Sequence, residues 1–135
     1  MPEFFWSVRV YYEDTDAAGV VYHSNYLKFM ERARTEWLRK AGYSQQTLAT
    51  DEGIVFVVAK MNIEFVNPAR FDEVLNIHSK ITGMEGPRLI FEHSVVNESG
   101  QQKCRAGVDI VCVDSVSFRP KRIPNTIKVK LNYDG

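Results

Sequence analysis

Residues 24–41 read SNYLKFMERARTEWLRKA. Apolar side chains recur in this stretch at spacings of three and four residues, which is the pattern of an amphipathic helix. They are Tyr26, Phe29, Met30, Ala33, Trp37 and Ala41. Gly42 follows, and a glycine at this place commonly ends a helix. We therefore predict one long helix over 24–41 whose apolar stripe faces a core.

On both sides of this helix the hydrophobic pattern has a period of two, which is typical of half-buried strands. A first strand is expected over 7–13. A short helical turn over 44–51 and four more strands follow, the strands over about 57–65, 74–82, 88–97 and 104–112. In the strand over 57–65, the odd-numbered residues are expected on the helix side and Val58, Lys60, Asn62 and Glu64 on the other.

Short turns join the last four strands, so the sheet should be mainly antiparallel. The predicted fold class is α+β, with five strands wrapped around one long helix. A chain of 135 residues is the size of one domain, and no linker or repeat divides it, so we expect a single domain over 1–135. The tail after Val113 is weakly patterned and yields no prediction.

Composition and charge exclude several classes of protein. Seventeen basic residues balance seventeen acidic ones, which argues against a dedicated nucleic-acid binder. The longest apolar run, 54–59, is far shorter than the roughly 20 residues of a membrane span, and the N-terminus lacks the features of a signal peptide. We expect a cytoplasmic protein. Cys104 and Cys112 are separated by about 26 Å along one strand, so buried thiols rather than a disulfide are predicted.

The segment between the first strand and the helix concentrates acidic residues. Glu13, Asp14 and Asp16 stand directly before the helix N-terminus, where free amides and the helix dipole favour negative charge. One interpretation is that Asp14 or Asp16 only caps the turn. The other is a carboxylate nucleophile or general base beside an oxyanion site, which acyl transfer requires.

A family resemblance rests on this segment. Residues 14–26, DTDAAGVVYHSNY, and 31–36, ERARTE, closely resemble the 4-hydroxybenzoyl-CoA thioesterase family of hotdog-fold proteins, and within it the Tol-Pal-associated acyl-CoA thioesterases. The resemblance extends over nearly the whole chain, including the motifs at 56–58, 68–70 and 111–114. Ala18 departs from the glycine found in many relatives, whereas Gly19 is retained.

The resemblance implies a hotdog fold and the hydrolysis of acyl-CoA thioesters without a cofactor. It assigns the catalytic carboxylate to Asp16, not Asp14, and the donor to the thioester carbonyl to the backbone N–H of His23. Asp16 either attacks the thioester carbon or activates water, and both routes stay open. Acyl carrier protein is a further candidate partner.

The secondary candidates for substrate binding are Tyr12, Gly19, Tyr22, the His23 side chain and Asn25. Tyr12 lies on the apolar side of the first predicted strand, which favours a core position. Tyr22 either lines an acyl pocket or packs on the helix start, and the His23 side chain either tunes Asp16, binds ligand or caps the helix. For Asn25 a role in ordering the turn is favoured.

Arg70 and Arg88 are candidates for binding the phosphates of coenzyme A, although a solvated surface explains each of them as well. His78 and His93 are expected to be exposed strand residues. Because the three histidines share no metal-ligand spacing with acids or cysteines, no metal site is predicted.

The expected assembly is a homodimer or a dimer of dimers with a shared site. A five-stranded sheet leaves an open strand edge, and Val58, Ile90, Val96 and Val111 are expected on the face away from the helix. Two other functions compete with thioester hydrolysis. A hotdog hydratase is disfavoured because Asp16 and His23 lack the hydratase spacing, and a module that only binds acyl chains is disfavoured because Asp16 is retained.

Overall fold

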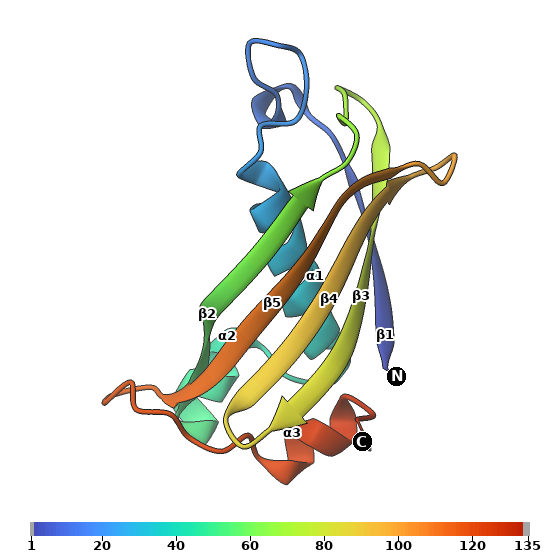
Figure 1. Cartoon of the computed structure of the whole chain (residues 1–135). Coiled ribbons are helices and arrows are strands. Elements are labelled where there is room, and N and C mark those ends of the chain that lie inside the picture. The colour runs from blue at the N-terminus through green and yellow to red at the C-terminus, as the bar shows by residue number, and fades with distance from the viewer. Residues whose placement is uncertain (1, 134–135) are drawn as a thin grey trace.

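The computed structural model describes residues 2–133. Five antiparallel strands form one sheet in the order β1-β3-β4-β5-β2, and a single long helix, α1, lies along one face of it (Figure 1). The strands are β1 (Glu3–Arg9), β2 (Ile54–Phe65), β3 (Val74–Glu85), β4 (Arg88–Asn97) and β5 (Gln102–Asp114). The predicted α+β class and the five-stranded sheet with one helix are confirmed.

Helix α1 spans Asn25–Lys40, with Ser24 and Ala41 as its caps, as the apolar spacing predicts. Its buried face includes Phe29, Met30 and Ala33, each at most 1% exposed. The expected helical turn after it consists of α2 (Gln45–Thr47) and a wider turn over Leu48–Glu52. The tail contains a further short helix, α3 (Asn125–Lys130), which the sequence analysis did not predict.

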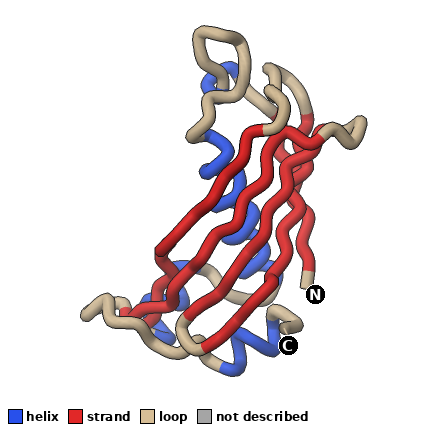
Figure 2. Tube along the Cα trace, viewed as in Figure 1, coloured by secondary structure: helices blue, strands red, loops and turns tan. Residues whose placement is uncertain are grey.

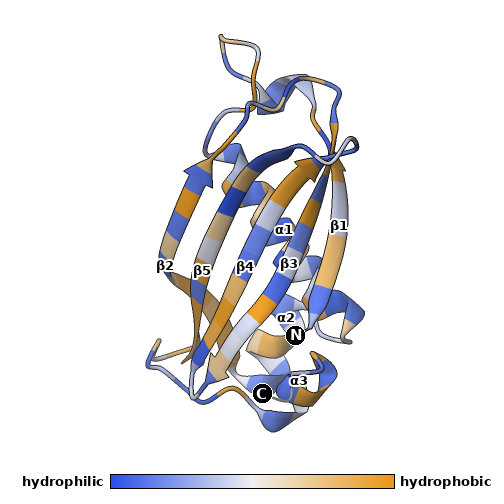
Figure 3. Ribbon diagram, turned by 45° about the vertical axis from the view of Figure 1, so that its right-hand side comes forward, coloured by the Kyte–Doolittle hydropathy of each residue, from blue (hydrophilic) through white to orange (hydrophobic). Residues whose placement is uncertain are grey.

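Side chains alternate between the two faces of the sheet, and Figure 3 shows the resulting bands of opposite hydropathy along the strands. The helix-facing residues of β3 and β4 are buried; they are Leu75, Ile77, Ser79, Ile81, Leu89, Phe91, His93 and Val95. Cys104 and Cys112 are free thiols buried on the same face of β5, as expected. Burial raises the pKa of Cys104 to about 12.

The predicted exposure of His93 is wrong. This residue is 2% exposed and lies on the helix-facing side of β4. The core accepts it because both ring nitrogens have polar partners: Nε2 lies 3.0 Å from Nη1 of Arg34, and Nδ1 lies 2.8 Å from Oγ of Ser79. Such pairing is what makes burial of a polar side chain tolerable.

A register shift in β2 overturns the predicted face of Val58. The pairing of β2 with β5 passes from Val58–Ile110 to Lys60–Asp109, so Ala59 forms a bulge. Before the bulge the even-numbered Phe56 and Val58 therefore face the helix, and after it the odd-numbered residues do. Val58 lines the helix side of the sheet, whereas Ile90, Val96 and Val111 lie half-buried on the outer face, as predicted.

Loops gather at the two ends of the strands (Figure 2). One end holds the segment before α1, the end of β2 and the start of β3; the other holds the β3–β4 turn and the tail (Figure 1). Within residues 2–133, no helix is long and apolar enough to cross a membrane.

Candidate active site

The loop before α1 closes on itself and presents Asp16. Thr15 and Val21 form an antiparallel bridge, and within it the Asp16 N–H donates to the Val20 carbonyl at 2.9 Å. Gly19 donates back to the Asp16 carbonyl at 2.9 Å with a φ of +80°, a conformation that favours glycine. Gly19 thus shapes the loop, and Asp16 is exposed.

The Asp16 carboxylate has one oxygen engaged by the loop itself, since Oδ1 accepts from the Ala18 N–H at 2.9 Å. In the part of the chain that the structure describes, no other group donates to this carboxylate. An exposed carboxylate with a free oxygen on a fixed loop is suited to act on a substrate that docks from solvent.

Asp14 lies two residues earlier in a different environment. Its Oδ2 accepts from the Tyr11 N–H at 2.8 Å, and its Oδ1 accepts from Asn25 Nδ2 at 3.1 Å. Asn25 is the first residue of α1 and is 7% exposed. Asp14 and Asn25 therefore fasten the loop to the helix, which agrees with the favoured ordering role of Asn25.

The backbone of His23 lies at the start of α1, two residues before the first helical residue. Among residues 2–133, no backbone carbonyl accepts a hydrogen bond from the His23 N–H. The dipole of the 16-residue helix adds a positive partial charge at this end. The His23 ring contacts Tyr22 at a centroid distance of 4.4 Å and Phe65 of β2 at 6.2 Å, so aromatic rings border the amide.

The expected core position of Tyr12 is wrong. Strand β1 ends at Arg9, and Tyr12–Asp14 form a turn of 3-10 helix, so the alternation of the strand does not reach Tyr12. Its side chain is 76% exposed and stacks on Phe71 with ring centroids 4.1 Å apart. Tyr22 is also solvent-accessible, at 46%.

The segment 66–73 contacts the Asp16 loop through backbone hydrogen bonds. Val21 donates to the Ala69 carbonyl at 2.8 Å, and Val20 forms a bridge with Arg70. Arg70 is exposed beside the loop. Arg88 lies at the opposite end of the sheet, at the start of β4, where it pairs with Asp109 at 2.8 Å. Within one chain, the structure therefore brings Arg70 but not Arg88 close to the loop of Asp16.

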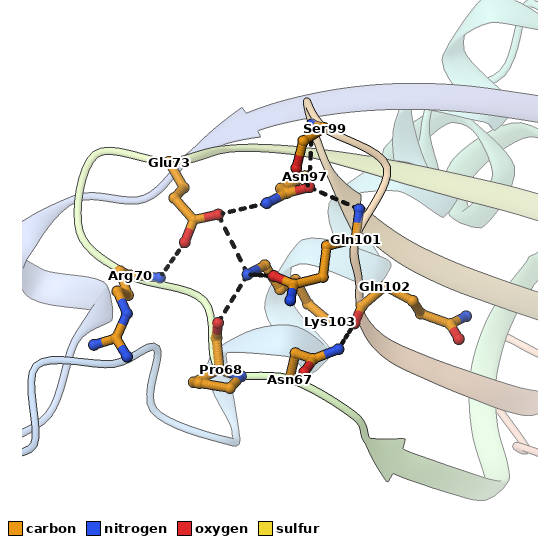
Figure 4. Close-up of polar contacts among 9 residues, drawn as sticks. All are labelled: Asn67, Pro68, Arg70, Glu73, Asn97, Ser99, Gln101, Gln102 and Lys103. Atoms are coloured by element: carbon orange, nitrogen blue, oxygen red, sulfur yellow. Dashed lines mark hydrogen bonds and ion pairs between the residues drawn. The ribbon is translucent and has the colours of Figure 1, made fainter.

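A buried lysine, missed by the sequence analysis, holds this supporting segment (Figure 4). Lys103 of β5 is 3% exposed, and its Nζ donates to the Pro68 carbonyl at 2.9 Å and lies 3.5 Å from Glu73 Oε2. Asn97 of β4 donates to the same carboxylate oxygen at 3.3 Å. Strict alternation places the neighbour of the core residue Cys104 on the outer face of the sheet. The sequence pattern of β5 therefore does not predict the burial of Lys103.

A groove of about 520 Å³ runs between α1 and the strands β2, β4 and β5. Its apolar walls include Leu27, Leu38, Phe56, Val58, Leu89 and Ile110. Leu27 stands in the first turn of α1, so the groove begins close to the helix start that carries His23. Asp16 and His23 are not among the lining residues, and a concave, mostly apolar groove of this size is suited to hold an apolar ligand.

Known proteins similar to this chain include thioesterases. Residues 10–131 match the Thioesterase-like superfamily. The chain is 49% identical over 124 residues to the acyl-CoA thioester hydrolase YbgC of Escherichia coli, covering 92% of each protein. A probable thioesterase from Bartonella henselae superposes with a TM-score of 0.85 at 37% identity, over 90% of this chain and 99% of that one. A 4-hydroxybenzoyl CoA thioesterase shares the fold at a TM-score of 0.87 and 24% identity, over 97% and 99% of the chains.

Proposed function

The chain belongs to the thioesterase-like superfamily and has its hotdog fold, and we propose that this acyl-CoA thioesterase hydrolyses its substrate with the Asp16 carboxylate. The observation that carries the proposal is an exposed carboxylate fixed on the loop that leads into α1, at whose start the His23 N–H has no backbone acceptor among residues 2–133. The apolar groove that begins at Leu27, in the first turn of α1, would receive the acyl group.

In the proposed reaction, the thioester carbonyl oxygen accepts a hydrogen bond from the His23 N–H, and the helix dipole stabilises the negative charge that develops there. Asp16 acts by one of two routes. Its free oxygen attacks the thioester carbon, which expels the coenzyme A thiolate and leaves a mixed anhydride for water to hydrolyse. Alternatively, Asp16 takes a proton from a water molecule that attacks directly. The thiolate needs little acid assistance, since a free thiol has a pKa of about 8.5.

The remaining candidates have supporting roles in this proposal. Tyr22 and the His23 ring border the reacting carbonyl, and Gly19 gives the loop its turn. Tyr12, stacked on Phe71, and Arg70 stand on the exposed side of the loop, where the nucleotide part of coenzyme A would approach. Asn25 acts indirectly through Asp14.

The working unit in this proposal is at least a homodimer. Strand β2 is an edge of the sheet, and the groove beside it exposes Val58 by 52% and Leu27 by 37%. Antiparallel pairing of β2 with its copy satisfies the open backbone groups and covers these side chains. It also brings the far end of one sheet, including the partner subunit's Arg88, to the Asp16 loop, so the site is shared.

A thiol-release screen tests the function. The full chain is assayed with short, long and aromatic acyl-CoAs and with acyl carrier protein thioesters, with Asp16→Asn as the blank. Release of free coenzyme A that the blank lacks supports the proposal, and the preferred substrate shows whether coenzyme A or the carrier protein is the natural thiol. No thiol release from any of these substrates refutes it.

A further inference from the structure

Arg34 is a charged residue in the wall of the apolar groove. It is 8% exposed and comes from the middle of α1. Burial lowers its pKa to about 10, which still leaves it protonated at neutral pH. Placing a cation in such surroundings is costly unless it is paired and hydrogen-bonded. The ion-pair and hydrogen-bond partners of this guanidinium therefore indicate which ligand the groove binds.

The structure gives Arg34 no ion-pair partner in its own chain. Across residues 2–133, no carboxylate oxygen lies within 4.0 Å of its guanidinium. Glu31, one turn earlier on α1, also lines the groove, but it is exposed and acts on Arg34 only through its charge at longer range. The Phe91 ring, with its centroid 5.9 Å from Cζ, supplies a weak cation–π contact.

One polar contact fixes the side chain without neutralising it. Nη1 of Arg34 lies 3.0 Å from Nε2 of His93. Burial, and then the charge of Arg34, lower the pKa of His93 to about 3, so the imidazole is neutral and accepts this hydrogen bond. Its other nitrogen then carries the proton and donates to Ser79 Oγ at 2.8 Å. Arg34 has five N–H donors, and His93 takes one of them.

We infer that Arg34 is a specificity residue that pairs with a carboxylate at the far end of the acyl group, so that the groove selects ω-carboxyacyl thioesters. This inference rests on the proposed function. A carboxylate is the ligand that the fork of a guanidinium binds best, and it would supply the missing counter-charge. On the helix-start side of Arg34, Leu27 of α1 and Met61 of β2 line the groove and would contact the methylene chain between the two ends of such an acyl group.

The position of Arg34 sets the length of this acyl group. Arg34 lies nine positions after Asn25, which is about 14 Å along the helix axis. Helical side chains lean toward the N-terminus, which shortens the span to the thioester carbonyl. An extended chain advances about 1.2 Å per bond, so an acyl group of roughly ten carbon atoms reaches the guanidinium.

The test compares pairs of substrates that differ only at the far end. Wild-type protein is assayed by thiol release with ω-carboxyacyl-CoAs of 6, 8, 10 and 12 carbons and with the methyl-ended acyl-CoAs of the same lengths. We expect a maximum of kcat/KM in the carboxylated series near 10 carbons, at least tenfold above the methyl-ended substrate of that length. The comparison needs no variant, so it does not depend on how a mutant folds.

Arg34→Met then removes the charge but keeps the length of the side chain, and Arg39→Met, on the exposed side of the same helix, is the matched control. The loss of kcat/KM in the Arg34 variant should be at least tenfold greater on decanedioyl-CoA than on decanoyl-CoA, as expected for a lost charge-assisted hydrogen bond. The inference is overturned if wild-type protein prefers the methyl-ended series, or if Arg34→Met loses kcat/KM equally on both substrates. An equal loss together with dissociation of the dimer would show that the partner subunit supplies the counter-ion. Failure of every acyl-CoA to react would refute the proposed function instead.

Discussion

Asp14 Oδ1 accepts a hydrogen bond from Nδ2 of Asn25 at 3.1 Å, which ties the acidic loop to the first residue of helix α1. Asp16, two residues later, makes no such link to the helix, and its Oδ1 bonds only to the Ala18 N–H of its own loop. The two acids of the Asp-Thr-Asp motif therefore differ in their contacts: Asp14 holds the loop to the helix, whereas the proposed catalytic residue Asp16 keeps one carboxylate oxygen without a donor among residues 2–133.

Substitution with asparagine should separate these roles. Asp16→Asn keeps the shape of the side chain but removes the base or nucleophile, so kcat should fall by roughly 10² to 10⁴-fold while the thermal unfolding temperature stays close to that of wild type. Asp14→Asn should lose much less activity and show its effect chiefly as lower stability, since Oδ2 also accepts from the Tyr11 N–H. Full activity of Asp16→Asn on the best substrate would overturn the assignment.

The stability of the protein should depend on pH through His93. In the folded chain burial lowers its pKa to about 3, whereas the unfolded chain takes up a proton near pH 6.5. The unfolded state binds more protons in this window, so His93 contributes stability above pH 6.5 that is lost as the pH falls toward 3. The loss reaches at most about 1.4 kcal/mol per pH unit.

Urea unfolding between pH 7 and pH 4 measures this contribution. The variant His93→Gln cannot titrate, and its amide oxygen can still accept from Arg34, so its free energy of unfolding should fall less steeply than that of wild type. His78→Gln, on the outer face of the sheet, is the control and should keep the wild-type slope. Identical slopes for wild type and His93→Gln would show that His93 is not held neutral in the core.

Regular patterns in the sequence predicted most of the fold, and local exceptions account for the errors. The spacing of apolar residues placed α1 correctly to within one residue at each end. The alternation in β2 misassigned Val58, because a single extra residue at Ala59 inverts every side chain before it. His93 was misassigned because its partners Arg34 and Ser79 come from two other elements, and pairings across elements leave no trace in local periodicity.

For the candidate site too, the sequence located the parts that are contiguous and missed the parts that meet only in the fold. The Asp16 loop and the helix start are contiguous in sequence, so the motif and its helix located them without the structure. The supporting residues Lys103 and Glu73 are 30 positions apart and meet only when the loop over 66–73 folds against β5 (Figure 4). Tyr12 was placed in the core because the strand was expected to continue past Arg9, whereas the chain turns at Tyr12.

Replacing Lys103 should destabilise the end of the molecule that carries the site. Lys103→Met leaves the Pro68 carbonyl without its donor and the Glu73 carboxylate without its ion pair. Because the Glu73 side chain is 25% exposed and keeps its bond from Asn97, the expected cost is about 1–3 kcal/mol. Activity should fall as well, because Ala69 of the same segment accepts from Val21. Urea unfolding and the thiol-release assay measure the two effects. Lys80→Met, in an exposed pair with Glu3, should stay within about 0.5 kcal/mol of wild type; equal stability of the two variants would contradict the role given to Lys103.

Placing a charge beside the open edge of β2 should separate the proposed dimer. Val58 is 52% exposed on the edge strand and lines the apolar groove, so Val58→Lys puts an ammonium group where the partner's copy of β2 would pack. An obligate interface of this kind usually buries more than about 2,000 Å², and a buried unpaired charge at its centre is strongly unfavourable.

We expect sedimentation at micromolar concentration to show wild type and the control Val116→Lys, altered at a side chain that is 91% exposed, as dimers or larger. Val58→Lys should dissociate and lose activity, because the Asp16 loop then lacks the strands of its neighbour. A fully active wild-type species at the 15.5 kDa of one chain would refute the shared site.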